Sequence, residues 1–241
     1  ADTLELIAES RGEAFYRGQL ASAIVANSQE SGGAMKLHDL AKHSPEWIAP
    51  TSQHYRHVTL HEIPPNGQGL AAQIALAILN HFDLPGLPPN GDQSVHFQIE
   101  AMKIAIRAAF DHFADPGSMT ISAEALLEPE SIKLAAMTIG ENASPLPPVQ
   151  LPSTKDTVYL ATADADGRMV SFIQSNYQGF GSGIVVPDTG IAMQNRGSGF
   201  TLQKGHPNEV AGGKRPFHTI IPGFITELDE PRMSFGVMGG H

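Results

Sequence analysis

Residues 157–174 read TVYLATADADGRMVSFIQ, and this stretch decides the fold class. Residues 158–163 and 168–174 are rich in β-branched and aromatic side chains, which favour strands. Between them lies Asp164-Ala165-Asp166-Gly167, a typical turn sequence. We therefore predict an antiparallel hairpin with Thr157 at its start.

The rest of the second half has the same β character. A second hairpin is expected where the turn Pro187-Asp188-Thr189-Gly190 separates residues 183–186 from residues 191–195. Further short strands are expected over residues 217–221 and 235–238.

The first half instead places its apolar residues at helical spacing. One strand, over residues 55–62, is the exception. Helices are expected after a Thr3 cap, through Leu20, Ile24 and Val25 up to Gly32-Gly33, and over residues 37–41, 69–82, 93–113, 122–127 and 129–137.

A proline-rich linker separates the two halves. It covers residues 141–156 and contains Pro145, Pro147, Pro148 and Pro152. The chain therefore divides into residues 1–156, mostly helical and ending in the linker, and residues 157–241, mostly antiparallel strands. The fold class is α+β.

Composition excludes several kinds of protein. The 241 residues carry 15 Lys and Arg against 25 Asp and Glu, a net charge of −10, which argues against nucleic-acid binding and against docking on anionic lipid. No apolar run approaches the roughly 18 residues of a membrane helix. The absence of Cys excludes disulfides and thiolate catalysis. The compartment stays open between cytoplasm and periplasm.

The sequence predicts neither a metal site nor a cofactor. His54, His57 and His61 lie close together, but their spacing does not converge on one ion, and we expect a solvated strand face. The glycines of residues 179–183 lack the Lys and the helix of a phosphate loop. A tight turn is expected there, with an anion-binding concavity as the alternative.

Thr157 follows the linker directly and is the candidate nucleophile. A Thr hydroxyl needs a base, and the α-amine of the same residue, with a pKa of about 7.7–8.0, can serve if the chain is cut before it. From the residues alone, a Thr that merely starts a strand remains the alternative.

Several stretches, in order, resemble the gamma-glutamyltransferase family. Downstream of the linker they are residues 157–167, 171–177, 180–190, 213–216 and 239–240; upstream they are residues 14–18, 64–69 and 100–103. The resemblance implies an N-terminal-nucleophile hydrolase with a four-layer α-β-β-α sandwich. It also implies self-cleavage into a heterodimer of two subunits, with higher oligomers left open, and a small-molecule amide substrate.

The same resemblance implies roles for individual residues. Thr157 is then the nucleophile, and the Asp156–Thr157 bond is the cleavage site. Ser175 matches a hydroxyl that hydrogen-bonds near the nucleophile. Gly239 and Gly240 match the pair whose N–H groups stabilise the oxyanion.

The substrate pocket departs from the family pattern. The Asp that holds the α-amine of a glutamyl substrate is replaced by Gly199. The positions expected to bind substrate here are Asn176, Tyr177, Asn195, Arg196, His218 and Thr219. We expect an amide hydrolase whose acyl group need not be γ-glutamyl, as in the family's oxamate amidohydrolases and glutaryl- and cephalosporin-type acylases. Arg196 pairs either with a substrate carboxylate or in an ordinary ion pair.

Members of the family are longer at both ends, so the chain is expected to be a central fragment. It then lacks the family's carboxylate-binding Arg and the strands that follow the oxyanion glycines. The alternative function is a catalytically inactive or unprocessed family member that acts as a binding protein.

Overall fold

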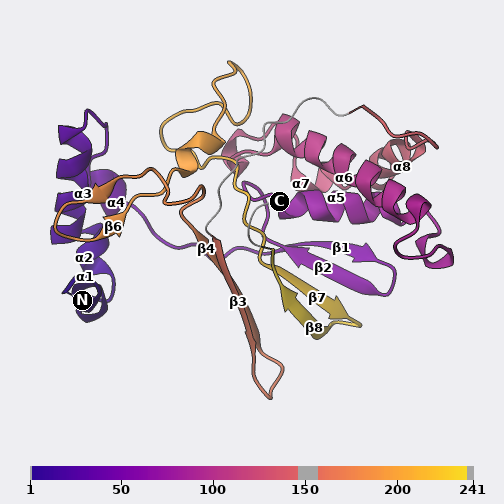
Figure 1. Ribbon diagram of the computed structural model, residues 1–241, viewed down its shortest axis with the longest axis horizontal. Helices are drawn as coiled ribbons and strands as arrows, with labels where there is room; N and C mark the ends of the chain where they lie inside the picture. The colour runs from indigo at the N-terminus through magenta and orange to yellow at the C-terminus, as the bar shows by residue number, and fades with distance from the viewer. Residues whose placement is uncertain (1, 146–156, 238–241) are drawn as a thin grey trace. The chain divides into compact units, whose positions relative to one another are not determined.

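The computed structural model describes residues 2–145 and 157–237. The chain forms two compact units (Figure 1). Unit 1 contains Ala1–Trp47 and Asn176–Asn195, and unit 2 contains Ile48–Ser175 and Arg196–His241. Both units therefore combine residues from before and after the linker.

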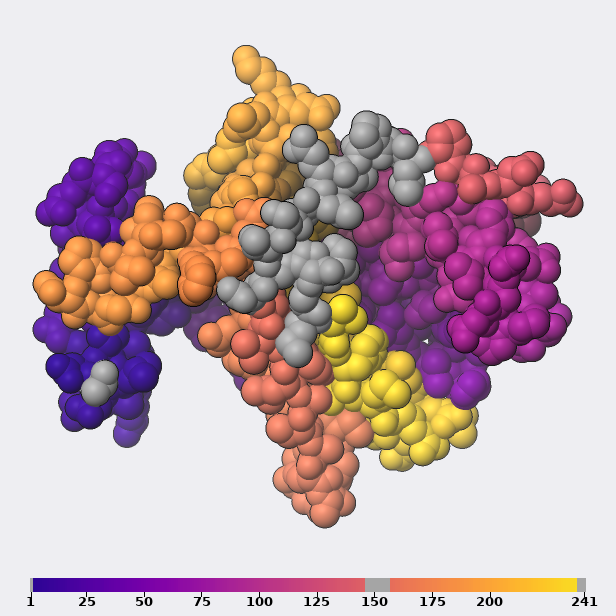
Figure 2. Space-filling view, viewed as in Figure 1, coloured from indigo at the N-terminus to yellow at the C-terminus, as the bar shows by residue number. Residues whose placement is uncertain are grey.

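Unit 1 is a small helical unit with a short hairpin. Its helices are α1 (Asp2–Glu9), α2 (Glu13–Tyr16), α3 (Gln19–Glu30) and α4 (Leu37–Ala41), and its strands are β5 (Val185–Val186) and β6 (Ile191–Ala192). In Figure 2 the orange hairpin residues lie against the indigo helices, and Thr3 Oγ1 donates to the Thr189 carbonyl at 2.7 Å. Helix α3 buries Leu20, Ile24 and Val25, as their spacing predicts.

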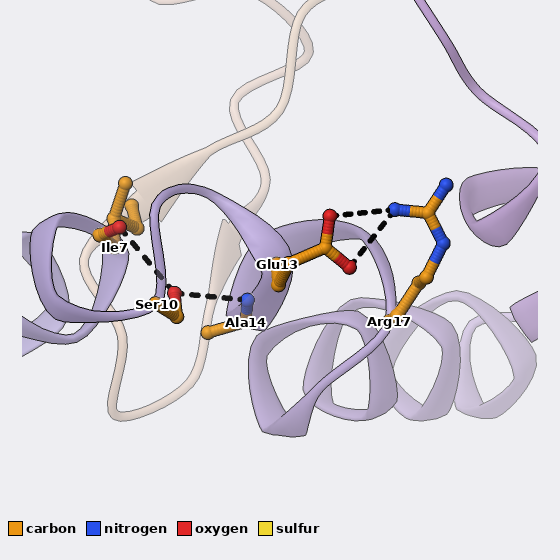
Figure 3. Close-up of polar contacts among 5 residues, drawn as sticks. All are labelled: Ile7, Ser10, Glu13, Ala14 and Arg17. Atoms are coloured by element: carbon orange, nitrogen blue, oxygen red, sulfur yellow. Dashed lines mark hydrogen bonds and ion pairs between the residues drawn. The ribbon is translucent and has the colours of Figure 1, made fainter.

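A hydrogen bond and a close backbone approach explain the residues found at positions 14 and 18. Ser10 Oγ shares its hydrogen between the carbonyls of Leu6 and Ile7. The same oxygen accepts from the Ala14 N–H at 3.0 Å, which joins α1 to α2, and Figure 3 shows its bonds to Ile7 and Ala14. A Cβ at Gly18 would lie 2.7 Å from Ala14 Cα. Glycine is therefore required where the chain turns from α2 into α3.

Unit 2 is built on two long helices. They are α5 (Gly69–Leu79) and α6 (Asp92–His112), followed by α7 (Ala123–Leu126) and α8 (Pro129–Met137). Three short 3₁₀ turns accompany them: η1 (Leu84–Gly86), η2 (Pro116–Ser118) and η3 (Arg196–Gly199). Helix α6 presents Ala101, Ala105 and Ala109 to the core, and this stripe of small residues lets α5 approach closely.

Helix α5 packs on a four-stranded antiparallel sheet in the order β1-β2-β7-β8 (Figure 1). The strands are β1 (Thr51–Tyr55), β2 (Val58–Glu62), β7 (Gly223–Glu227) and β8 (Glu230–Phe235). The predicted hairpin is confirmed as β3 (Thr157–Ala163) paired with β4 (Met169–Ser175).

The single strand expected over residues 55–62 is wrong. It is two strands, with a turn at Arg56 whose φ is +57°. His57 and His61 therefore do not share a strand face. The His61 Nδ1 atom bonds Ser52 Oγ and its Nε2 atom bonds Thr226 Oγ1, each at 2.8 Å.

The strand expected over residues 217–221 is also wrong. Pro216 and Pro222 flank this segment, and only His218 forms an isolated bridge, to Gly67. Strand β7 begins one residue after Pro222 and was not predicted. Strand β8 begins at Glu230, earlier than expected, and ends at Phe235.

Two features are absent from the residues that the structure describes. Over residues 2–145 and 157–237, no helix is long and apolar enough to cross a membrane. Within these same ranges, no group of three His, Cys, Asp or Glu side chains is placed to hold a metal ion.

Glu62, at the end of β2, is buried with only 2% of its surface exposed. Within the described part of the chain, neither of its carboxylate oxygens has a hydrogen-bond partner. A Cβ at Gly69 would lie 2.5 Å from Glu62 Oε2, and one at Gly223 would lie 2.8 Å from Oε1. Burial raises the pKa of Glu62 from 4.5 to about 7.

The Glu62 carboxyl should make folding stability depend on pH. Between pH 4.5 and 7 the folded state binds more protons than the unfolded state, so the free energy of unfolding falls as pH rises. We expect a fall on the order of 2 kcal/mol. Urea unfolding at pH 5 and pH 8 should show this fall in the wild type and in the exposed control Glu130→Gln, but not in Glu62→Gln. Equal pH dependence in all three would contradict the assignment.

Candidate functional site

The hairpin brings Thr157 and Ser175 together. Strands β3 and β4 pair from Thr157 opposite Ser175 to Ala163 opposite Met169, so the first residue of one strand faces the last residue of the other. Thr157 Oγ1 donates a hydrogen bond to Ser175 Oγ at 2.9 Å. Both residues are half-buried. A hydroxyl thus lies within hydrogen-bond reach of the candidate nucleophile.

A chain of hydroxyl groups ties the hairpin to β8. Ser171 Oγ donates to the Phe235 carbonyl at 3.0 Å. Its single hydrogen is used there, so the 2.8 Å contact with Tyr159 is a hydrogen bond donated by the Tyr159 hydroxyl. A Cβ at Gly236 would overlap the Tyr159 ring. The end of β8 is therefore held on the hairpin.

The segment that contains His218 and Thr219 is held by Asn66 and Gln68. Asn66 Nδ2 donates to the Pro216 carbonyl at 2.6 Å, and the Asn66 carbonyl accepts from the His218 N–H at 2.9 Å. Gln68 Nε2 donates to the Thr219 carbonyl at 2.9 Å. These hydrogen bonds of Asn66 and Gln68 hold the segment in place of the strand ladder that was expected for it.

The buried side chain of Asn208 binds the same segment through Phe217. Asn208 Nδ2 donates to the Gly199 carbonyl at 2.6 Å, and its Oδ1 accepts from the Phe217 N–H at 3.0 Å. A Cβ at Gly199 would lie only 2.6 Å from the Phe217 carbonyl oxygen. On this backbone no side chain fits at position 199, an Asp included.

Arg196 begins the turn η3 and is 5% exposed. Its Nη1 donates to Thr219 Oγ1 at 3.1 Å. Burial, and then the Arg196 charge, lower the pKa of His218 from 6.5 to about 4. His218 is therefore neutral at neutral pH, and its Nδ1 accepts from the Ile220 N–H at 3.3 Å. Arg196, His218 and Thr219 form one cluster, with Arg196 as its positive charge.

The remaining predicted substrate-binding residues lie in unit 1. The Asn195 N–H donates to the Asn176 carbonyl at 3.2 Å, and the Asn195 amide exchanges two hydrogen bonds with Gln178. Tyr177 lies between them with a φ of +79°. The glycines of residues 179–183 have positive φ values, as a tight turn requires.

Three predicted residues, Asp156, Gly239 and Gly240, lie outside the described residues. Sequence reasoning missed Asn208 altogether and gave Asn66 and Gln68 no role. Asn66 and Gln68 fall within residues 64–69, one of the stretches that resemble the family, and this could have indicated that they have a role. Asn208 lies in an irregular loop, and its spacing carried no signal.

The chain is similar to one protein family and to relatives that are named as hydrolases. The family described as gamma-glutamyltranspeptidase matches residues 1–241. The glutathione hydrolase-like YwrD proenzyme of Bacillus subtilis is 39% identical over 240 residues, and the oxamate amidohydrolase proenzyme of Klebsiella pneumoniae is 38% identical over 242 residues. Each alignment covers 100% of this chain and 45% of the relative.

A solved structure shows the same architecture. The cephalosporin acylase of Bacillus halodurans is 51% identical, with a TM-score of 0.92, over 100% of this chain and 44% of that one. The expected mixed helix–sheet fold of this family is thereby confirmed. The chain spans less than half the length of the relatives it matches.

The close approach of Gly199 to the Phe217 carbonyl oxygen can be tested by comparing two substitutions in the turn η3. Gly199→Ala should lower the free energy of unfolding by about 1–3 kcal/mol, because the new methyl group collides with the Phe217 carbonyl. Gly197→Ala in the same turn is the matched control, since a Cβ there meets nothing within 4 Å. Chemical denaturation measures both. Equal stabilities for the two variants would show that the backbone at position 199 is free to move.

Proposed function

The chain belongs to the gamma-glutamyltranspeptidase family, and from that premise we propose that it carries the nucleophile of a self-processing threonine amidohydrolase. The observation that carries the proposal is the hydrogen bond between Thr157 and Ser175 at the first residue of a strand. The linker precedes this residue directly, so cleavage before it yields a new N-terminus at the paired hydroxyls.

Cleavage follows from the chemistry of Thr157. Its Oγ attacks the Asp156 carbonyl, the C–N bond breaks, and the hydroxyl proton passes to the departing nitrogen, which becomes an α-amine. Water then opens the resulting ester, releasing the Asp156 carboxyl and restoring the Thr157 hydroxyl. Ser175 Oγ, already bonded to Thr157 Oγ1, orients that hydroxyl for the attack.

Turnover repeats the same steps on an external amide. The free α-amine of Thr157 takes the Oγ proton while Oγ attacks the substrate carbonyl, and the proton then goes to the leaving amine. Water hydrolyses the acyl ester and regenerates the enzyme. An amine in place of water would give acyl transfer.

We assign stabilisation of the oxyanion to the N–H groups of Gly239 and Gly240, and the length of chain between the described residues and these glycines supports this. Gly236 lies on the ring of Tyr159, which is two residues, or about 7 Å, along the strand from Thr157. Three residues after Gly236 span at most about 10 Å. The glycine N–H groups therefore come from a stretch long enough to reach Thr157.

The pocket favours an acyl group without an α-amine. The family's amine-binding Asp is replaced by Gly199, where the Phe217 carbonyl leaves no room for a side chain. Arg196 supplies a buried positive charge beside Thr219. We infer a substrate that carries a carboxylate on its acyl part. The names of the oxamate amidohydrolase and cephalosporin acylase relatives are consistent with this inference.

After cleavage the two pieces, residues 1–156 and 157–241, should stay together as a heterodimer. Strand β2 comes before the cut and β7 after it, and they pair in one antiparallel ladder. The Asn66 and Gln68 bonds to residues 216–219 also cross the cut. The proenzyme names of the relatives fit such a two-subunit product.

Removal of the nucleophile tests self-cleavage. Thr157→Ala should leave the full-length protein as one chain, and Ser175→Ala should slow cleavage about tenfold or more, because the orienting hydroxyl is lost. Thr162→Ala, an exposed position on the same strand, should be cut like the wild type. Denaturing gels and intact masses report the result. Cleavage of Thr157→Ala at the same bond would refute the mechanism.

Chromogenic amides test the pocket. We expect a higher kcat/KM for glutaryl p-nitroanilide than for γ-glutamyl p-nitroanilide, which differs by its α-amine. Arg196→Met should lower kcat/KM for the glutaryl substrate roughly 30-fold, about 2 kcal/mol, and change that for the neutral butyryl anilide much less. A strong preference for the γ-glutamyl substrate would contradict a pocket for a carboxylate. So would an Arg196→Met variant that loses as much kcat/KM on the butyryl anilide as on the glutaryl anilide.

A further inference from the structure

Three side chains on one face of α6 hold the main chain just before the linker's undescribed part. They are His96, Glu100 and Lys103, at positions i, i+4 and i+7. His96 Nε2 donates to the Gly140 carbonyl at 2.8 Å. Glu100 Oε1 accepts from the Ser144 N–H at 3.2 Å, and Lys103 Nζ donates to the Ser144 carbonyl at 2.8 Å. Both main-chain polar groups of Ser144 are thus bound.

The Glu100–Lys103 pair is unlike an ordinary surface pair. Its Nζ–Oε1 distance is 2.6 Å, and the two side chains are only 4% and 16% exposed. The Lys103 hydrogen bond, together with those from Ser144, lowers the pKa of Glu100. The Glu130–Lys133 pair on α8 has the same i,i+3 spacing, but its side chains are more than half exposed. A buried ion pair adds little stability over apolar residues. Stability therefore does not explain why a buried pair is placed at this point of the main chain.

The location of Ser144 supplies that explanation. Residues 145–156 join Ser144 to Thr157, and Thr157 is fixed at the other end by its pairing with Ser175. We propose that Glu100 and Lys103, assisted by His96, are positioning residues for self-cleavage. They fix the upstream end of the segment that must bring the Asp156 carbonyl to Thr157 Oγ. This inference rests on the proposed function.

Two physical effects of this anchor differ in size. Without it, the tether lengthens by about five residues, and loop-closure entropy alone would slow cleavage by roughly twofold. Direction matters more, because misplacement of reacting groups by about 1 Å can cost about 100-fold in rate. A positioning role therefore predicts a loss well above twofold.

The test measures cleavage of the full-length precursor made by cell-free synthesis and followed over time on denaturing gels. Glu100→Ala and Lys103→Met should each be cleaved about tenfold more slowly than the wild type, whereas Lys103→Arg, which keeps the cation, should recover most of the rate. Glu130→Ala and Lys133→Met are the matched controls and should cleave at the wild-type rate.

Two further readouts separate positioning from stability. Once fully cut, Lys103→Met should hydrolyse glutaryl p-nitroanilide with a kcat/KM within about twofold of the wild type. Its thermal midpoint should be lower than that of Lys133→Met, because Glu100 is left buried without its cation, so cleavage is compared at a temperature at which both variants are folded. A cleavage rate within twofold of the wild type would overturn the inference, as would a rate loss matched by an equal loss of mature activity. If Glu100→Ala does not fold, Lys103→Met decides. A wild type that is not cut before Thr157 defeats the proposed function itself, which is a different result.

Discussion

The pairing register of β3 and β4 is the constraint on which the candidate site depends. It places Thr157 opposite Ser175, and a slip of one residue would turn every side chain of a strand to its other face. The turn fixes this register: Asp164 Oδ1 accepts from the N–H groups of Asp166 and Arg168, and Gly167 has a φ of +81°. A short local turn thus determines whether the two hydroxyl groups meet at the far end of the hairpin.

A second constraint shapes the proposed pocket. Asn208 binds Gly199 and Phe217 at once and brings their backbones so close that position 199 admits only glycine. Arg196, at the start of the same turn, contributes the charge of the cluster. A glycine that excludes an acidic side chain and a buried cation therefore lie within one turn, and the proposal of an acyl group other than γ-glutamyl rests on this pair.

Much of this arrangement could be predicted from local sequence. The hairpin that starts at Thr157 and the helices α4 and α8 depend on turn residues and on periodicity, which a single sequence displays. The segment at 217–221 was misjudged because its partners are side chains more than 100 residues away, Asn66 and Gln68. Long-range polar contacts of this kind leave no periodic pattern. The role of Asn208 was missed although its partners, Gly199 and Phe217, are each only nine residues away, because it lies in an irregular loop whose spacing is not periodic. Glu62 gave no sign that its carboxyl is buried.

The proposed function depends on a self-cleavage that makes Thr157 a chain terminus, and the denatured intact mass of the purified full-length wild type measures this cleavage. We expect two species whose masses divide the sequence between Asp156 and Thr157. The piece that begins at Thr157 should carry a free α-amine. A single uncut chain, or two pieces divided at another bond, would contradict the account.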